Sequence, residues 1–303
     1  MKKKIRILAA GGIGDVLMLT PVLKEIRRLH PTCRMIVYCR DRVRTQVLAR
    51  NPYVDAVRLI SPLDRFLHFI KIIDGRHLFF TKVTDNGFID YGQLGMLMPH
   101  IFYSHSISKI IGEVVGINVS RTDVEIFLSA EEEARGRKGL IGLTSPVAIS
   151  VSGFCSPNKN WPIERWNALI RSMSDISFFQ LGLPDEPLIE GVVDMRGLPL
   201  RESFAMLKFA SAFIGVDSGL AHAASGLNVP TIVLFGPTNP AVVGHQQNTN
   251  IYHKARCSPC FDILLDAPCP YGRHCMHAIT IEEVRSALIR ILDTKTFGLP
   301  QVS

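Results

Sequence analysis

The residues with the clearest potential for chemistry are Asp217-Ser218-Gly219, which stand where a short apolar segment gives way to a run of small residues. Asp and Ser are favoured at the start of a helix, because their side chains accept hydrogen bonds from its first N–H groups. The N–H groups of Ser218, Gly219 and Leu220 would then point toward a ligand at the positive end of the helix dipole. Such a helix start is a common binding site for phosphate. The sequence therefore predicts an anion site at Asp217.

A second turn, Gly236-Pro237-Thr238, follows the next apolar segment, Thr231 to Phe235. In open α/β folds, ligands bind at the carboxyl ends of the strands. Two consecutive strands that end at Asp217 and at Gly236 would place both turns at one edge of a sheet. We expect both turns to contact the same ligand.

Lys159 lies in a loop that follows another predicted strand, Val147 to Val151. The loop opens at the mouth of the second sheet, and Trp161-Pro162 starts the next helix, with Pro at a tolerated first-turn position. Position alone leaves two interpretations. Lys159 is either a cation that faces the anion site or an exposed loop lysine, and the exposed lysine is the more common outcome.

Asp15 follows a glycine-rich turn that contains Gly12 and Gly14 and separates the first predicted strand from the first predicted helix. The spacing is not G-x-G-x-x-G, so a dinucleotide fingerprint is only weakly indicated. The glycines leave room for a substrate beside the Asp15 carboxylate. Spacing alone allows either a residue that stabilises the helix start or a catalytic carboxylate in a cleft.

The candidate residues lie between predicted strands and helices that alternate along the chain. This alternation is typical of an α/β fold with parallel sheets. We predict two Rossmann-like domains, residues 1–143 and 144–303. The helix pattern after the first turn continues to Leu29, and Leu63 to Ile73 forms an aromatic and basic stretch. This stretch packs in a core, lines an acceptor cleft or lies against lipid headgroups. The predicted strands are 5–9, 35–39, 54–59, 147–151, 178–181, 193–195, 213–216 and 231–236, and the predicted helices include 42–49, 106–115, 203–210 and 281–292.

The net charge of +7 belongs to the first half of the chain. Residues 1–143 contain 22 Lys and Arg against 14 Asp and Glu, whereas residues 144–303 contain 12 against 13. The first half is therefore either a solvated basic surface or the binding face for an anionic substrate or membrane surface. Nucleic acid is disfavoured, because no nucleic-acid-binding motif accompanies the charge. No apolar run reaches the roughly 20 residues of a membrane span, which predicts a cytoplasmic protein.

Four cysteines cluster in a proline-rich segment, with the spacing Cys257-x2-Cys260-x8-Cys269-x5-Cys275. Thiolates at such spacing suit tetrahedral zinc or iron. The cluster is either a structural metal site or a group of reduced thiols. The substitute ligands nearby are His253, His274 and His277.

Four motifs together resemble glycosyltransferase family 9, the ADP-heptose heptosyltransferases. They are Gly12-Ile-Gly-Asp15-Val-Leu with Thr20-Pro21, Lys159-Asn-Trp-Pro162, the stretch from Asp217-Ser-Gly-Leu-Ala-His222 to Phe235-Gly-Pro-Thr238, and the cysteine segment. The third motif is the most specific. The resemblance implies a GT-B fold, with two Rossmann-like domains facing each other across a cleft, the donor bound mainly by the second and the acceptor by the first.

The resemblance also implies roles for individual residues. A carboxylate matching Asp15 acts as the general base in a single inverting displacement, and His222 matches a donor-contacting histidine, with a core histidine as the alternative. Lys159 and the N–H groups at the start of the Asp217 helix are placed to stabilise the leaving ADP. The ribose-contacting carboxylate of the family aligns with Arg201 in one register and with Glu202 in the next. We choose Glu202, which carries a carboxylate. The donor-binding residues expected in the second domain are Lys159, Glu202, Asp217, Ser218, Gly219, Leu220, His222, Gly236, Pro237 and Thr238.

The sequence contains no Asp-x-Asp pair to hold a divalent metal on a nucleotide sugar, which favours catalysis without a metal. We therefore predict transfer of a heptose from ADP-heptose to lipopolysaccharide core or to a protein hydroxyl, at the inner face of the cytoplasmic membrane when the acceptor is a glycolipid. In some protein-modifying members of the family, the cysteine segment holds iron. The alternatives are a GT-B nucleotide-sugar epimerase and a non-catalytic nucleotide-binding assembly module.

Overall fold

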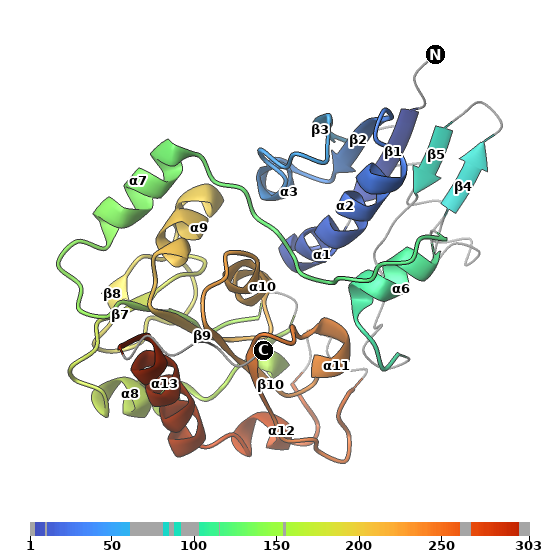
Figure 1. The fold of residues 1–303 in the computed structure, drawn as a ribbon. Helices are drawn as coiled ribbons and strands as arrows, with labels where there is room; N and C mark the ends of the chain where they lie inside the picture. The colour runs from blue at the N-terminus through green and yellow to red at the C-terminus, as the bar shows by residue number, and fades with distance from the viewer. Residues whose placement is uncertain are drawn as a thin grey trace. The chain divides into compact units, whose positions relative to one another are not determined.

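The chain folds into two compact units (Figure 1). The first contains Met1–Pro99 and His105–Ser129, and the second contains His100–Ser104 and Ala130–Ser303. The computed structural model describes residues 4–9, 11–60, 81–84, 88–91, 103–114, 116–153, 156–260 and 268–296. The stretch from Leu63 to Ile73, for which we predicted a core, cleft or lipid contact, lies outside these residues.

The first unit is built on a five-stranded sheet of order β3-β2-β1-β5-β4. All neighbouring strands are parallel except β4 and β5, which are antiparallel. Its elements are β1 Lys4–Ala9, α1 Ile13–Met18, α2 Thr20–Leu29, β2 Arg34–Cys39, α3 Arg42–Val47, β3 Ala56–Leu59, β4 Thr81–Thr84, β5 Phe88–Tyr91 and α6 Ile107–Val114.

The helix predicted to run from the glycine turn to Leu29 is two helices, α1 and α2, which meet at Leu19. Pro21 explains the break, because it has no N–H to donate to the carbonyl of Leu17. The Thr20 hydroxyl donates to that carbonyl instead, at 2.7 Å. The interruption leaves α1 as a short helix that presents Asp15 in its first turn.

The second unit is built on a six-stranded parallel sheet of order β11-β10-β9-β6-β7-β8. Its elements are α7 Ala130–Gly139, β6 Val147–Ser150, the 3₁₀ turn η1 Pro157–Lys159, α8 Ile163–Arg171, β7 Phe178–Gln180, β8 Val193–Asp194, α9 Leu200–Lys208, β9 Ala212–Val216, α10 Gly219–Gly226, β10 Thr231–Phe235, α11 Pro240–Val243, β11 Thr249–Tyr252, α12 His274–His277 and α13 Ile281–Thr296.

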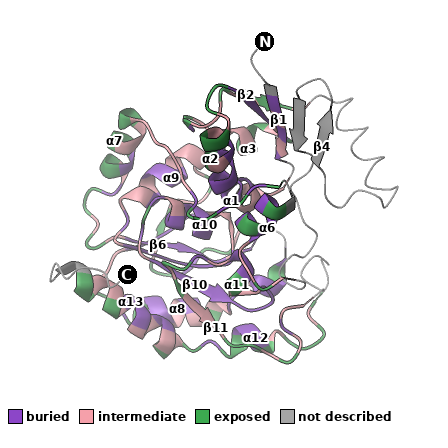
Figure 2. Ribbon diagram, turned by 45° about the vertical axis from the view of Figure 1, so that its right-hand side comes forward, coloured by how far each residue is buried: buried purple, intermediate pink, exposed green. Residues whose placement is uncertain are grey.

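The central strands of the second sheet are buried along their whole length, as expected for a parallel sheet covered on both faces (Figure 2). One face packs against α8 and α13, with Trp161 and Trp166 among the largest buried side chains. The other face carries α10, which contacts β9, β10 and α9. The carboxyl ends of β6, β9 and β10 meet at one edge, which is where the predicted site residues lie.

Helix α7 packs on α9, so the contacts divide the chain at Ser129 and Ala130, earlier than the predicted boundary at residue 143. Glu132 forms an ion pair with Arg201, with an Nη2–Oε2 distance of 2.7 Å. A Cβ atom at Gly136 would lie only 2.2 Å from the carbonyl oxygen of Ala205. The glycine therefore permits the close approach of the two helices.

None of the helices in the described ranges is long and apolar enough to cross a bilayer.

Candidate functional site

A buried cluster of charged and polar side chains lies at the carboxyl edge of the second sheet. The Nζ atom of Lys159 donates to Oδ2 of Asp217 at 2.7 Å, and the Thr238 hydroxyl donates to the same oxygen at 2.9 Å. These three residues are 58 and 21 positions apart in the sequence. The structure thus brings together residues from two predicted donor-binding motifs.

Strand order explains how these residues meet. Asp217 directly follows β9, whose neighbours in the sheet are β6 and β10. The loop after β6 forms the turn η1, which ends at Lys159, and the loop after β10 contains Thr238. Parallel neighbouring strands end at the same edge of a sheet, so their following loops converge there.

The cluster keeps Asp217 ionised. Burial alone raises the pKa of this carboxyl, but the Lys159 ammonium, followed by His222, outweighs it and holds the pKa well below its usual range. The Lys159 side chain is 10% exposed and the Asp217 side chain 6%. The interpretation of Lys159 as an exposed loop lysine is therefore wrong.

Helix α10 starts as the sequence predicts, with Ser218 as its N-cap. The Ser218 hydroxyl accepts a hydrogen bond from the N–H of Ala221 at 3.4 Å. The N–H groups of Gly219 and Leu220 belong to the first turn, where no carbonyl of the helix can accept them. The helix start thus retains the donor geometry of an anion site.

His222 lies in the next part of α10 and is buried. Its Nε2 atom is 3.6 Å from Oδ1 of Asp217, and its Nδ1 atom is 2.9 Å from Nε2 of His245. Its ring is therefore held by side chains, unlike that of a core histidine bonded to the backbone. His245 was missed by the sequence analysis, because it is an isolated histidine outside every motif.

The turn at Gly236 and Pro237 is held by the cysteine segment. The carbonyl of Gly236 accepts a hydrogen bond from the Ser258 hydroxyl, and the carbonyl of Pro237 accepts one from the N–H of Cys260 at 3.1 Å. A Cβ atom at Gly236 would lie 2.3 Å from Sδ of Met276. Glycine at this position therefore allows α12 to pack against the turn.

The thiols of Cys257, Cys260 and Cys269 lie close enough to Cys275 to influence its ionisation. Burial, together with these thiols, raises the pKa of Cys275 to about 11. Among the residues that the structure describes, which omit 261–267, no three His, Cys, Asp or Glu side chains are grouped to hold a metal ion. The arrangement does not form a coordination shell, and the metal site stays a prediction.

Glu202 lies in the first turn of α9 and is half-buried. The neighbouring Arg201 is bound to Glu132 of α7, through both Nε and Nη2. This ion pair commits Arg201 to the packing of α7 on α9. It favours our choice of Glu202 over Arg201 as the residue that contacts a donor.

In the first unit, Asp15 occupies the first turn of α1. Its Oδ2 atom accepts a hydrogen bond from the N–H of Gly12 at 2.6 Å. A Cβ atom at Gly11 would lie 2.4 Å from this carboxylate, so the glycine makes room for it. Nε of Arg44 also donates to the carbonyl of Gly11, a contact that no motif indicated. The carboxylate thus stabilises the helix start, which is compatible with a second role as a base.

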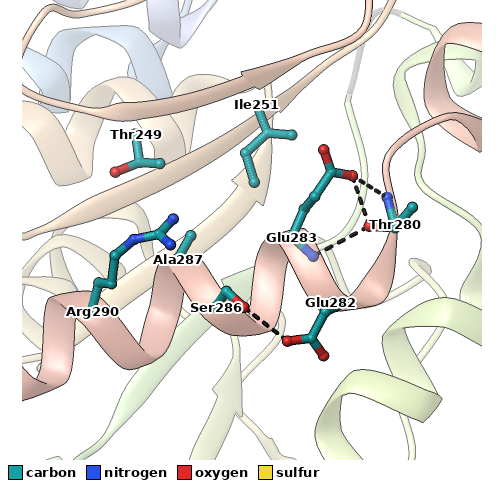
Figure 3. A pocket seen from close by; sticks show the side chains of 8 residues that line it. All are labelled: Thr249, Ile251, Thr280, Glu282, Glu283, Ser286, Ala287 and Arg290. Atoms are coloured by element: carbon teal, nitrogen blue, oxygen red, sulfur yellow. Dashed lines mark hydrogen bonds between the residues drawn. The ribbon is translucent and has the colours of Figure 1, made fainter.

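A separate cavity of about 390 Å³ lies between β11 and α13, away from these residues (Figure 3). Glu283 accepts hydrogen bonds from the N–H and the hydroxyl of Thr280 and therefore caps α13. Its other oxygen is 2.7 Å from Nε2 of His253. The acidic residues of this cavity thus have structural partners. Its lining residues are Thr249, Ile251, Thr280, Glu282, Glu283, Ser286, Ala287 and Arg290.

Comparison with known proteins agrees with this architecture. The solved glycosyltransferase of family 9 from Veillonella parvula matches with a TM-score of 0.72 and 18% identity, over 96% of this chain and 98% of that chain. The iron-containing heptosyltransferase TibC of Escherichia coli, solved with ADP-D-β-D-heptose, matches with a TM-score of 0.71 and 18% identity, over 97% of this chain and 76% of that one. The fold is therefore GT-B, with two Rossmann-like domains.

Sequence comparisons add similarity to one family of glycosyltransferases. The model of glycosyltransferase family 9 (heptosyltransferase) matches residues 197–269, which include Asp217, His222 and Thr238. Lipopolysaccharide heptosyltransferase 1 of Salmonella typhimurium is 29% identical over 143 residues, which cover 43% of this chain and 44% of that relative. The match thus spans less than half of that relative's length. The chain is therefore similar to glycosyltransferase family 9 in its overall fold and, in sequence, over residues 197–269.

Proposed function

We propose that this protein is an inverting glycosyltransferase that moves a heptose from ADP-heptose to an acceptor hydroxyl. The observation that carries the proposal is the buried cluster of Lys159, Asp217 and Thr238 beside the start of α10. Asp217 and Thr238 lie inside the matched region. The N–H groups of Gly219 and Leu220, with Lys159, would stabilise the negative charge that develops on the leaving diphosphate. The solved complex of TibC with ADP-D-β-D-heptose supports this donor.

In this proposal, Asp15 removes the proton of the acceptor hydroxyl as that oxygen attacks the anomeric carbon. A positioned general base contributes on the order of 10²- to 10⁴-fold in rate. Glu202 is proposed to contact the ribose and His222 the diphosphate side of the donor. The basic first half of the chain supports an anionic acceptor, such as a phosphorylated glycolipid at a membrane surface. A protein hydroxyl is the other acceptor that we propose.

A structural zinc or iron ion at the four cysteines is a further part of the proposal. It rests on their spacing and on their shared neighbourhood around Cys275. The turn at Gly236 and Pro237 depends on the same segment, so a metal there would stiffen the wall of the donor site. The proposed transfer itself assigns no step to this metal.

The test is ADP release from ADP-heptose in the presence of glycolipid and protein acceptors, followed by mass spectrometry. We expect turnover by the wild type and a loss on the order of 100-fold or more in Asp15→Asn. The amide of Asn keeps an oxygen for the N–H of Gly12, so α1 remains capped.

The matched control is Asp55→Asn, which changes another carboxylate of the first unit that accepts a backbone N–H, from Met35 at 2.7 Å. This variant should keep wild-type turnover. Near-normal transfer by Asp15→Asn would show that Asp15 is not the base. Epimerised donor without transfer would indicate an epimerase, and donor binding without any turnover would indicate a non-catalytic module.

A further inference from the structure

Two buried histidines, His222 of α10 and His245 just after α11, form a pair beside the proposed donor site. Nδ1 of His222 is 2.9 Å from Nε2 of His245. The ring centroids are 5.1 Å apart and the planes are at 84°. The residues are 6% and 8% exposed. The pair thus makes a direct hydrogen bond that is shielded from solvent.

Only one proton can lie between these two nitrogens, so one ring must donate and the other must accept. Burial lowers the pKa of His245 to about 3. His245 is therefore neutral near pH 7 and carries a single N–H. The direction of the bond then depends on which nitrogen of His222 bears a proton.

The surroundings of His222 decide this question. Its Nε2 atom faces Oδ1 of Asp217 at 3.6 Å, and that carboxylate is ionised through its pairing with Lys159. An Nε2 lone pair would face a negative charge, so Nε2 carries the proton. In the tautomer with the proton on Nε2, Nδ1 of His222 is the acceptor.

We propose that His245 is a positioning residue for the donor site. It donates its Nε2–H to Nδ1 of His222, and this bond fixes the ring and, together with Asp217 on the other side of the ring, the tautomer of His222. The Nε2–H of His222 then stays directed toward Asp217 and the diphosphate end of the donor. The inference rests on the proposed function, in which His222 contacts the donor.

The packing of the segment after α11 does not require this bond. Asn248, in the same segment, forms hydrogen bonds with Ser225 of α10 at 2.8 and 3.0 Å. The carbonyl of His245 accepts a further bond from Nδ2 of Asn250 at 3.1 Å. The cavity that the two rings line has no room for a water molecule while His245 is in place. A variant that lacks the N–H should therefore affect His222 without detaching the segment.

The first test is a long-range ¹H–¹⁵N correlation spectrum of the free, histidine-labelled protein. We expect a protonated Nε2 and an unprotonated Nδ1 for His222, and a protonated Nε2 for His245. In His245→Phe, the ¹⁵N resonance of Nδ1 of His222 should shift, because this nitrogen loses its hydrogen-bond donor. A wild-type spectrum with Nδ1 of His222 protonated would overturn the proposal.

The second test is donor kinetics. His245→Phe should raise the KM for ADP-heptose about five- to tenfold, the effect of one buried hydrogen bond, with a smaller change in kcat. His245→Gln, whose amide can still donate, should recover most of the affinity. Ser225→Ala, which removes the other contact between α10 and this segment, should leave KM unchanged.

An unchanged KM in His245→Phe, or an equal rise in Ser225→Ala, would refute a positioning role. The spectrum needs no turnover and therefore separates this inference from the proposed function. If the wild type failed to turn over ADP-heptose, the proposed function would fall, and the spectrum alone would decide whether His245 sets the tautomer of His222.

Discussion

Lowering the pH from 7 to 5 should destabilise the second unit through His245. This histidine is neutral in the folded protein, because its pKa is lowered to about 3. In the unfolded chain it has an ordinary pKa of about 6.5. The unfolded state thus binds one more proton throughout the window between these values. Stability therefore rises with pH across this window and is lost as the pH falls below about 6.5.

The magnitude follows from the two pKa values. One pKa unit corresponds to about 1.4 kcal/mol, so the full window is worth about 5 kcal/mol. Between pH 7 and pH 5, the linkage relation gives about 2 kcal/mol of lost unfolding free energy. Asp217 does not contribute over this range. Its folded pKa is lowered, so its stabilisation is lost only below its unfolded pKa of about 3.9.

The assay is urea unfolding of the wild type and of His245→Gln at both pH values. Trp161 and Trp166 are the only two tryptophans of the chain, and both are buried in the second unit. Tryptophan fluorescence therefore reports the unfolding of that unit alone. The variant cannot titrate at position 245, and the histidines that are distant from this position are common to both proteins and cancel in the difference.

We expect the stability difference between the wild type and His245→Gln to shift by about 2 kcal/mol between the two pH values, in favour of the variant at pH 5. A loss of stability in the variant at pH 7 does not affect this comparison. Parallel pH dependence in the two proteins, to within about 0.5 kcal/mol, would refute the argument that His245 is buried neutral.

Two further predictions concern other parts of the structure. Gly136→Val should lower the unfolding free energy of the second unit by about 1–3 kcal/mol, because its Cβ would meet the carbonyl of Ala205. The control is Ala134→Val, at an exposed position of the same helix. Equal losses of unfolding free energy in the two variants would contradict the packing of α7 on α9. Purified protein should contain about one equivalent of zinc or iron if the cysteines bind a metal, and less than about a tenth of an equivalent would exclude that site.

Much of the second unit could be predicted from the sequence, because its signals are local. Runs of apolar residues mark strands such as Ala212–Val216 and Thr231–Phe235, and the Asp-Ser-Gly cluster marks the helix between them. The order of strands and helices then brings their ends to one edge. Lys159 could be placed at that edge, but its exposure could not be judged, because its partner Asp217 is 58 residues away.

The histidine pair could not be predicted, because its members belong to no joint motif. His222 and His245 are 23 residues apart, and the bond depends on the path of the chain through β10 and α11. The contact of Arg44 with the glycine turn is likewise set by the packing of α3 beside α1. Periodicity and caps describe neighbours in sequence, whereas these contacts require the tertiary structure.

The carboxylate of Asp217 at a proposed anion site has a physical explanation. A buried ammonium without a counterion is strongly destabilised, and Asp217 allows Lys159 to remain charged and buried before any ligand binds. The pair is close to neutral as a whole, so the attraction for a diphosphate comes largely from the directed N–H groups at the start of α10. Orientation then matters more than excess charge, which is why the side chains that hold Lys159 and His222 in place, Asp217 and His245, are central to the site that we propose.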